Sequence, residues 1–349
     1  MRVRAACQLR RAIVLPIILM LFAIFMGSAR AADSAVVLMY HRFGETNYPS
    51  TNITIEQFEA HIQELSRNEY SVKSLPEIIT AIRAGRSLPK NTVGISIDDS
   101  YLSVYQEAWP RLRQAKFPFT LFVATEPVDN RSPGHMSWTQ LRELADAGVT
   151  IGNHTVNHPH MPLLSSSRNS AEINISTARF KTELGIVPNL IAYPYGEYSL
   201  AVGKVTKQAG FIVAFGQHSG VIHMGSDFLN LPRFAFNEAY GVVHRLRTAA
   251  RSLPLHVRDV TPADMLLKKS NNPPLFGFTV DNIPPHHLSQ LACYVSGQGK
   301  PQIERLGERR MEVRMAKAFR TGRTRINCTF PEKGGRWRWF GKQFFFPPG

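Results

Sequence analysis

The sequence predicts an α/β protein in which a distorted (β/α)7-type barrel is followed by a small β-rich domain. Three observations lead to this prediction. Between residues 36 and 236, short apolar runs of strand length alternate with segments of helical periodicity. Gly148, Gly185 and Gly210 each lie where a helix would end before the next apolar run. After about residue 250, helical periodicity fades and strand-like runs prevail.

The expected strands of the first domain are spaced so that a crossover helix fits between them. Thr54 and Gln57 form a capping box at one helix start, and Ser137 precedes another helical segment. Such alternation is typical of parallel strands, and a barrel-like sheet fits it best, with an open doubly wound sheet as the alternative. The expected strands cover residues 36–40, 92–97, 119–123, 149–152, 189–193, 211–215 and 231–236.

The first 31 residues have the pattern of a secretory signal peptide. Several arginines precede an apolar run over residues 12–26, and Ala29-Arg30-Ala31 then provides a small-x-small cleavage site. A retained membrane anchor is the alternative, but an apolar run of about 15 residues is short for a membrane span. We therefore expect an exported protein, periplasmic or extracellular, with one domain over residues 32–248 and a second over residues 255–349.

Export would place the cysteines of the mature protein in an oxidising compartment. Cys7 belongs to the leader, so Cys293 and Cys328 remain in the second domain. In an oxidising compartment this pair is expected to form a disulfide, with two buried thiols as the alternative. The bond would close a loop of about 35 residues and stabilise the fold by roughly 4 kcal/mol in the chain-entropy model.

Positive charge is concentrated near the C-terminus. The formal net charge is +15, and residues 300–349 contain 13 Lys or Arg against 4 acidic residues. A basic module in an exported protein suggests an anionic glycan or the cell surface as a partner, and argues against nucleic acid. Arg336, Trp337, Arg338 and Trp339 alternate, so a strand would separate arginines from tryptophans. The tryptophans could stack on sugars, but core packing is the favoured interpretation.

Polar side chains follow several expected strands. His41 follows the first strand, the pair Asp98-Asp99 the second and His154 the fourth, with His158 four residues later. The turn Pro194-Tyr195-Gly196 follows the fifth. Each has a structural explanation when taken alone, such as a helix cap, a surface histidine or an ordinary turn. The carboxyl ends of parallel strands meet at one rim, however, so these groups are expected to lie together.

Their chemistry points to a metal. One carboxylate and two imidazoles, with a position open for water, are the ligand set of a catalytic Zn²⁺. A metal also explains two adjacent carboxylates at the end of a buried strand, because like charges raise each other's cost of ionisation. One aspartate would bind the cation, and the other would lie near the bound water as a base.

The stretches SIDDS, HTVNHP and AYPYG resemble three motifs of the polysaccharide deacetylases of carbohydrate esterase family four, the NodB-like domain. The resemblance covers residues 36–236 and implies a distorted barrel that removes acetyl groups from N-acetylated sugars with a divalent metal, most commonly Zn²⁺. It implies Asp98 as catalytic base and a Tyr195 backbone N–H for the oxyanion. The implied metal ligands are Asp99, His154 and His158.

The sequence departs from the family pattern at three points. The late Leu-His-x-His motif is absent, Ala192 replaces the arginine expected before the Pro-Tyr-Gly turn, and Ser100 replaces a glycine. Poly-β-1,6-N-acetylglucosamine deacetylases are similar in having Tyr-His after the first strand and YPYG without arginine. In that branch the early histidine is the general acid, which implies this role for His41.

The sequence therefore predicts a metal-dependent deacetylase acting on an N-acetylglucosamine-containing polymer. One alternative is an esterase that removes O-acetyl groups from xylan or peptidoglycan. The other is a catalytically inactive glycan-binding protein on the same scaffold, which the missing arginine and late histidine would allow.

Overall fold

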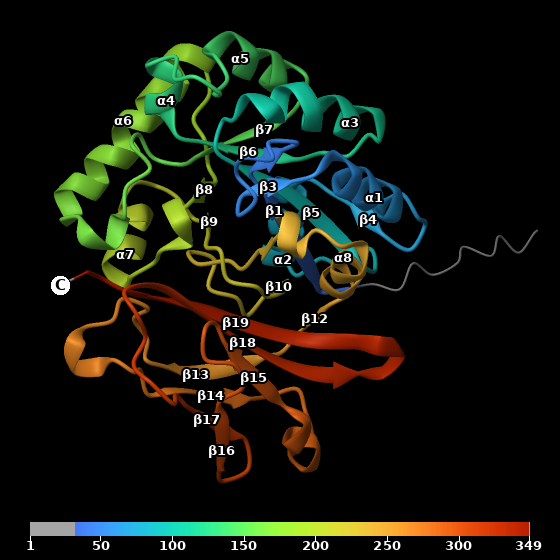
Figure 1. Ribbon diagram of the computed structural model, residues 1–349, viewed down its shortest axis with the longest axis vertical. Helices are drawn as coiled ribbons and strands as arrows, with labels where there is room; N and C mark the ends of the chain where they lie inside the picture. Colours follow the sequence, from blue (N-terminus) through green and yellow to red (C-terminus); the bar gives the residue numbers. More distant parts are fainter. Residues whose placement is uncertain (1–31, 349) are drawn as a thin grey trace, which may run out of the picture.

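The structure of the protein is a computed structural model that describes residues 32–348. The predicted signal peptide, residues 1–31, lies outside the described residues. An α/β part and a β-rich part lie against each other, in the upper and lower halves of Figure 1. Within residues 32–348, no helix is both long enough and apolar enough to cross a bilayer.

The α/β part is built on one curled sheet. From β5 to β9 the strands follow chain order without reversal, and each is parallel to its neighbour. A doubly wound sheet would reverse its order at a switch point, so the barrel-like prediction is confirmed. The main path runs through β10 (Ile222–His223), β1 (Ser34–Tyr40), β5 (Thr92–Asp98), β6 (Thr120–Val123), β7 (Thr150–Asn153), β8 (Ile191–Ala192) and β9 (Ala214–Phe215).

A short segment connects the two edges of this sheet. Leu231 forms a parallel bridge to Phe215 of β9. A few residues later, β11 (Phe234–Ala235) pairs in parallel with β1. Residues 231–235 therefore run from the last strand to the first and draw the sheet into a curl. Two short parallel pairs complete this part: β4 (Ser71–Val72) adds to β5, and β2 (Arg42–Phe43) pairs with β3 (Asn52–Ile53).

Helices cover the outside of the curl (Figure 1). The predicted capping box is present at Thr54, and the helix start predicted at Ser137 also has one; in both, the side chain accepts a hydrogen bond from the backbone N–H of the third residue of its helix. Gly185 ends the longest helix with φ of 71°, a left-handed conformation that favours glycine. The helices are α1 (Ile55–Leu65), α2 (Leu75–Arg83), α3 (Trp109–Gln114), α4 (Thr125–Asp129), α5 (Trp138–Asp146), α6 (Ser166–Leu184), α7 (Leu200–Gln208) and α8 (Val243–Ala250).

The strands of the sheet are buried on both faces. In β1, Val36, Leu38 and Tyr40 belong to one apolar cluster, whereas Ala35 and Val37 belong to another on the opposite face. This is typical of a parallel sheet covered on both sides, and it explains why the strands are continuous apolar runs.

A buried histidine lies in the core beside β1. His61 of α1 is fully buried, accepts a hydrogen bond from the Tyr40 hydroxyl (2.9 Å) and donates one to the Gly241 carbonyl (2.8 Å). Burial lowers the pKa of His61 from 6.5 to about 4. The ring is therefore neutral in the folded protein at pH 7.

Replacing His61 with glutamine is expected to make stability less dependent on pH. Between pH 6.5 and about 4 the unfolded chain binds a proton at His61 that the folded protein does not bind. This contribution is therefore fully present above pH 6.5 and is lost as the pH falls, by about 2 kcal/mol between pH 7 and 5. Glutamine can keep both hydrogen bonds but does not titrate. Urea unfolding of both proteins at pH 7, 6 and 5 gives the free energy of unfolding at each pH. If this free energy changed equally with pH in the two proteins, the expectation would be contradicted.

The β-rich part consists of two four-stranded sheets, as the sequence predicts in outline. Phenylalanines from both sheets fill the space between them, for example Phe276 against Phe344 at 5.7 Å between ring centroids. One sheet has the order β12 (Leu253–Pro254), β19 (Arg336–Phe346), β18 (Gly322–Glu332), β15 (Ala292–Val295). The other has the order β13 (Val257–Thr261), β14 (Phe276–Val280), β17 (Arg310–Arg314), β16 (Gln302–Leu306).

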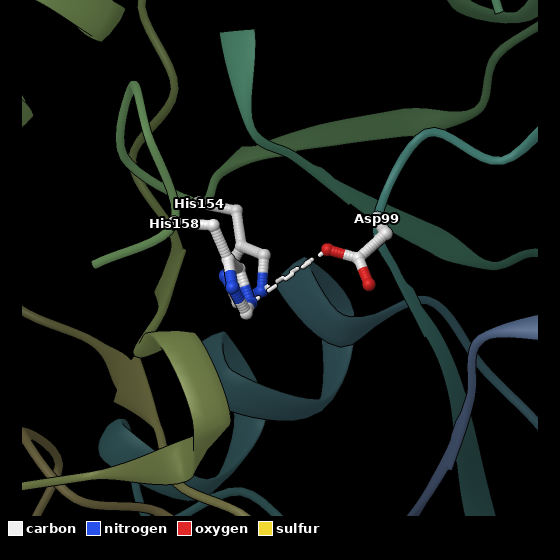
Figure 2. Close-up of side chains that lie close together, drawn as sticks. All are labelled: Asp99, His154 and His158. Carbon is white, nitrogen blue, oxygen red and sulfur yellow. Dashed lines mark ion pairs between the residues drawn. The ribbon is translucent and has the colours of Figure 1, made fainter. Parts of the chain in front are cut away.

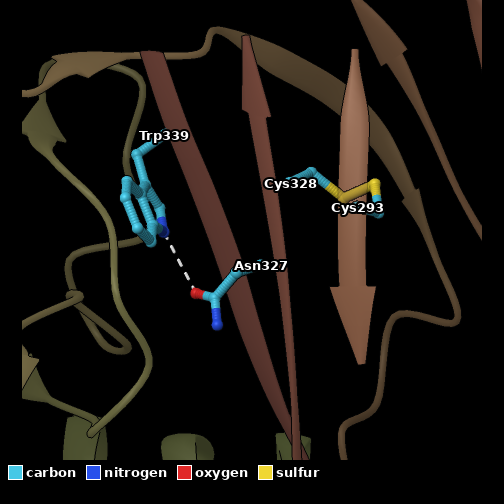
Figure 3. Close-up of a disulfide and its surroundings, with 4 residues drawn as sticks. All are labelled: Cys293, Asn327, Cys328 and Trp339. Atoms are coloured by element: carbon cyan, nitrogen blue, oxygen red, sulfur yellow. Dashed lines mark hydrogen bonds between the residues drawn. A yellow bond between two sulfur atoms is a disulfide. The ribbon is translucent and has the colours of Figure 1, made fainter. Parts of the chain in front are cut away.

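The two cysteines form the expected disulfide. Cys293 of β15 and Cys328 of β18 lie directly opposite each other in neighbouring antiparallel strands, and their sulfur atoms are bonded (Figure 3). The bond joins residues 35 apart in the sequence, within an apolar cluster that both cysteines help to form.

The two tryptophans of β19 do not fill the interior of the β-rich part, so that prediction is wrong. Trp339 donates a hydrogen bond to Asn327 (3.0 Å; Figure 3) and packs edge-on against Phe234 of the first sheet. Trp337 remains 38% exposed. The reason is the alternation of β19: Phe340 and Phe344, on its other face, supply the interior.

Candidate metal centre and active site

Three predicted ligands come together at the carboxyl ends of two strands of the sheet. Asp99 directly follows β5, His154 directly follows β7, and His158 lies in the loop after it. The Asp99 carboxylate is 3.7 Å from Nε2 of His154 and 3.8 Å from Nε2 of His158 (Figure 2). One ligand atom from each of the three lies within 4.8 Å of the others. This arrangement can hold a single metal ion.

The hydrogen bonding of His154 fits a metal ligand. Its Nδ1–H donates to the Ala192 carbonyl (2.7 Å), and its Nε2 faces the Asp99 carboxylate. Among the described residues this buried Nε2 has no hydrogen-bond partner, although buried polar atoms are nearly always paired. Burial, helped by His154, lowers the pKa of His158 to about 4, so this ring is neutral at pH 7. Two imidazoles facing one carboxylate suit a divalent cation such as Zn²⁺.

The backbone around these ligands is strained. Asp99, Thr155, His158 and Tyr195 have φ of 65°, 69°, 52° and 57°, in the left-handed region that non-glycine residues seldom adopt. Such conformations cost on the order of 1–3 kcal/mol each and tend to cluster at functional sites. The surrounding sheet holds these residues in the orientation that brings their side chains together.

Asp98, the last residue of β5, is paired with a buried arginine. Arg233 donates from its two terminal nitrogens to both carboxylate oxygens of Asp98, at 2.6 and 2.8 Å, and both side chains are fully buried. Arg233 also donates to the Gly216 carbonyl and to the Ser96 hydroxyl. Burial alone would raise the pKa of Asp98, but Arg233, together with His154 and His41, outweighs it and the pKa falls to about 2. Asp98 is therefore held as an anion.

Sequence reasoning missed Arg233. It noted only that Ala192 stands where the family has an arginine. The structure supplies a guanidinium from the segment before β11 instead, and Arg233 stacks near the rings of Phe122 and Phe215. A signal was present in the weak strand at residues 231–236, because an arginine inside an apolar run needs a buried acidic partner.

His41 directly follows β1, so it lies at the edge of the sheet where Asp99 and His154 follow their strands. Its Nε2 is 3.9 Å from the Asp98 carboxylate, and its side chain is 14% exposed. Burial lowers the pKa of His41, whereas Asp98 and Asp99 act in the opposite direction. His41 lines the cavity in front of the metal ligands, while Asp98 lies behind it. The ring is thus in a position to meet both a substrate and the buried carboxylate.

The turn at residues 194–196 approaches the ligands from β8. The ring of Tyr195 packs edge-on against His158, with 4.4 Å between centroids. Its backbone N–H has no hydrogen-bond acceptor among the described residues. Gly196 is required here, because its φ is 67° and a Cβ atom would lie 2.4 Å from the backbone nitrogen of Gln217. The turn can therefore present a free amide to a ligand.

A cavity of about 650 Å³ brings these groups together. It is lined by the metal ligands Asp99 and His158, by His41, and by Tyr195. Its remaining wall comes partly from the β-rich part, through Arg323 and Arg325 of β18. The predicted site residues therefore surround one space, except that Asp98 and His154 are buried behind it.

Residues 85–214 match the family model for polysaccharide deacetylases. The chain contains a polysaccharide deacetylase domain. The matched segment includes both aspartates, both metal-ligand histidines and Tyr195, but neither His41 nor Arg233. Those two residues join the site of the deacetylase domain from the strands on either side of the match.

Relatives of known sequence and structure agree with this assignment. The chain is 26% identical to YxkH of Bacillus subtilis (strain 168) over 175 residues. The aligned residues are 50% of this chain and 61% of YxkH, so this chain spans less than two thirds of that relative. It is 25% identical to a Staphylococcus aureus (strain MRSA252) poly-beta-1,6-N-acetyl-D-glucosamine N-deacetylase over 232 residues, covering 59% of this chain and 80% of that one. The solved structure of the Streptococcus pyogenes deacetylase PplD in complex with acetate has the same fold, with a TM-score of 0.58, 22% identity, and coverage of 62% of this chain and 98% of that one.

Proposed function

We propose that this protein is a metal-dependent deacetylase that hydrolyses acetyl groups from an N-acetylglucosamine-containing polymer. The observation that carries the proposal is the buried Nε2 of His154, which has no hydrogen-bond partner within residues 32–348 and faces Asp99 and His158 at the edge of the cavity. The name of the Staphylococcus aureus relative supports an N-acetylated glycan as substrate. The linkage of the polymer is left open by this proposal.

Each residue has a defined task in this proposal. A Zn²⁺ ion bound by Asp99, His154 and His158 would polarise the acetyl carbonyl and lower the pKa of water. Asp98, kept anionic by Arg233, accepts the proton of the attacking water. The Tyr195 N–H donates to the oxygen that becomes negative, an interaction typically worth about 3–4 kcal/mol in the transition state. His41, 3.9 Å from the Asp98 carboxylate, passes the proton that Asp98 has taken from water to the sugar nitrogen as the C–N bond breaks, so Asp98 and His41 return to their starting states.

Two features of the structure argue against the inactive glycan-binding alternative. The missing arginine before the Pro-Tyr-Gly turn is compensated by Arg233, which pairs with Asp98 from another strand. The missing late histidine leaves the role of acid to His41, which lines the cavity near that pair. An inert scaffold would not need a buried charge pair behind a set of metal ligands.

The proposal includes action after export. The disulfide between Cys293 and Cys328 supports it, because such bonds persist in oxidising compartments. Acetylated polysaccharides of the cell envelope or of a secreted matrix would be accessible there.

Removal of the metal is expected to abolish acetate release. The purified protein would be treated with chelator, assayed on N-acetylglucosamine oligomers, and assayed again after addition of Zn²⁺. Replacing His158 with alanine should lower Zn²⁺ binding by at least about tenfold, because three ligands become two. His244, an exposed histidine of α8, provides the matched control variant. Calorimetric titration measures metal binding separately from activity, and acetate release that resists the chelator would contradict the proposal.

A further inference from the structure

Two arginines of the β-rich part line the cavity of the deacetylase domain. Arg323 and Arg325 lie two residues apart on β18, and both side chains reach the space that Asp99, His158 and Tyr195 also line. The hairpin of β18 and β19 lies along the border between the two parts (Figure 1). The family match ends at residue 214, so this wall lies outside the matched segment.

Arg325 is half-buried and lacks the acidic partner that a guanidinium withdrawn from solvent normally has. It donates to the side-chain oxygens of Gln343 (2.9 Å) and Gln217 (3.5 Å), and within residues 32–348 no carboxylate forms an ion pair with it. Burial, helped by Arg323, lowers the pKa of Arg325 to about 10. The group is still a cation at pH 7, although its surroundings disfavour the charge.

Three other arginines of the β-rich part have the carboxylate partner that Arg325 lacks. Arg310 pairs with Glu312, Arg314 with Glu304, and Arg338 with Glu332. Arg323 has only a distant carboxylate, Glu197 at 3.9 Å, and its guanidinium lies over the Tyr195 ring. Two neighbouring cations, one without a carboxylate, thus face the cavity.

We propose that Arg323 and Arg325 form a subsite for an anionic group on the glycan, close to the acetylated sugar. The inference rests on the proposed function and narrows its substrate to N-acetylated glycans that carry a carboxylate, sulfate or phosphate. A planar guanidinium binds such groups through two parallel hydrogen bonds, and the partial burial of Arg325 strengthens them. The anion of the glycan would form the ion pair that Arg325 does not form with any carboxylate of residues 32–348.

The subsite is connected to the catalytic turn. Gln343 accepts from Arg325 through Oε1 and donates to the Tyr195 carbonyl through Nε2, at 2.9 Å in each case. An anion that holds Arg325 in place therefore also supports the peptide whose N–H is proposed to bind the oxyanion. Charged substrates should then differ from neutral ones in turnover as well as in binding.

The experiment compares neutral and charged oligosaccharides of equal length. Chitin oligomers are the neutral probe, hyaluronan oligomers carry carboxylates, and 6-O-sulfated or 6-phosphorylated chitin oligomers carry the other two anions. Replacing Arg325 with glutamine is expected to lower kcat/KM for the preferred anionic oligomer by about tenfold to a hundredfold relative to the neutral one. Arg325→Lys should retain part of the preference. Arg314→Gln, with the same change of charge on β17 outside the cavity lining, should retain all of it.

Binding to the metal-free protein gives a readout that does not depend on activity. Tighter binding of an anionic oligomer than of its neutral counterpart, reduced in Arg325→Gln but not in Arg314→Gln, would support the subsite even if no oligomer were hydrolysed. In that case the proposed deacetylase function would fail and the subsite would stand. The subsite would be overturned if charged and neutral oligomers bound equally well. It would also be overturned if Arg325→Gln and Arg314→Gln lost the same amount of affinity for the anionic oligomer.

Discussion

Replacing Arg233 with methionine is expected to destabilise the protein by about 3–5 kcal/mol, because it leaves the Asp98 carboxylate buried without its counter-charge. Both side chains are fully buried, and two short hydrogen bonds join them. The folded fraction should also lose about 10²–10⁴-fold in acetate release, since a base without its guanidinium no longer remains anionic. Denaturant unfolding at pH 7 and acetate release from N-acetylglucosamine oligomers measure the two effects.

A second substitution separates the structural effect from the catalytic one. In the double variant Arg233→Met with Asp98→Asn, no charge remains buried, so most of the lost stability should return. Activity should stay as low as in Arg233→Met alone, because the base is absent. Recovery of both stability and activity would show that the pair only supports the fold and that Asp98 is not the base.

Much of the fold could be predicted because its signals are local. A buried parallel strand is a short apolar run, and β1, β5 and β7 begin and end within two residues of the predicted limits. The predicted strands at 189–193, 211–215 and 231–236 shrink to two residues each in β8, β9 and β11. Short pairings at the closing edge of a curled sheet leave the apolar pattern longer than the hydrogen-bonded ladder.

The meeting of the three predicted metal ligands could be foreseen for the same reason. Asp99, His154 and His158 lie directly after strands or within a few residues of one, and parallel strands bring their carboxyl ends to one rim. The resemblance to the deacetylase family then indicated which of the adjacent aspartates would bind the metal. Local pattern and topology thus predicted where these side chains meet, and the resemblance supplied the roles expected of them.

The rest of the site depends on contacts between distant parts of the chain. Arg233 lies 135 residues from Asp98, and Gln343 lies 148 residues from Tyr195. No periodicity links such pairs, because the first depends on how the sheet edge curls and the second on how two parts of the chain pack. The cavity wall formed by β18 was therefore inaccessible to sequence reasoning, which proposed an anionic glycan or the cell surface as the basic module's partner without locating a binding site.

Replacing His41 with glutamine is expected to impair amide hydrolysis far more than ester hydrolysis. An amine leaves poorly unless its nitrogen is protonated as the C–N bond breaks, so loss of the acid should lower acetate release from N-acetylglucosamine oligomers by about 10²–10⁴-fold. A nitrophenolate leaves without a proton, and release from 4-nitrophenyl acetate should change little. Both rates would be measured at the same Zn²⁺ occupancy, with His244→Gln as the control.

The ratio of the two losses decides between roles for His41. Its Nε2 is 3.9 Å from the Asp98 carboxylate, close enough for the ring to influence the base as well as the leaving group. Equal losses on amide and ester would mean that His41 acts on the attack of water, through Asp98, and that another group protonates the amine. A selective loss on the amide would identify His41 as the acid. It would also explain how the site works without the late histidine of the family, because a protein that cleaved only O-acetyl esters would have little need of that proton.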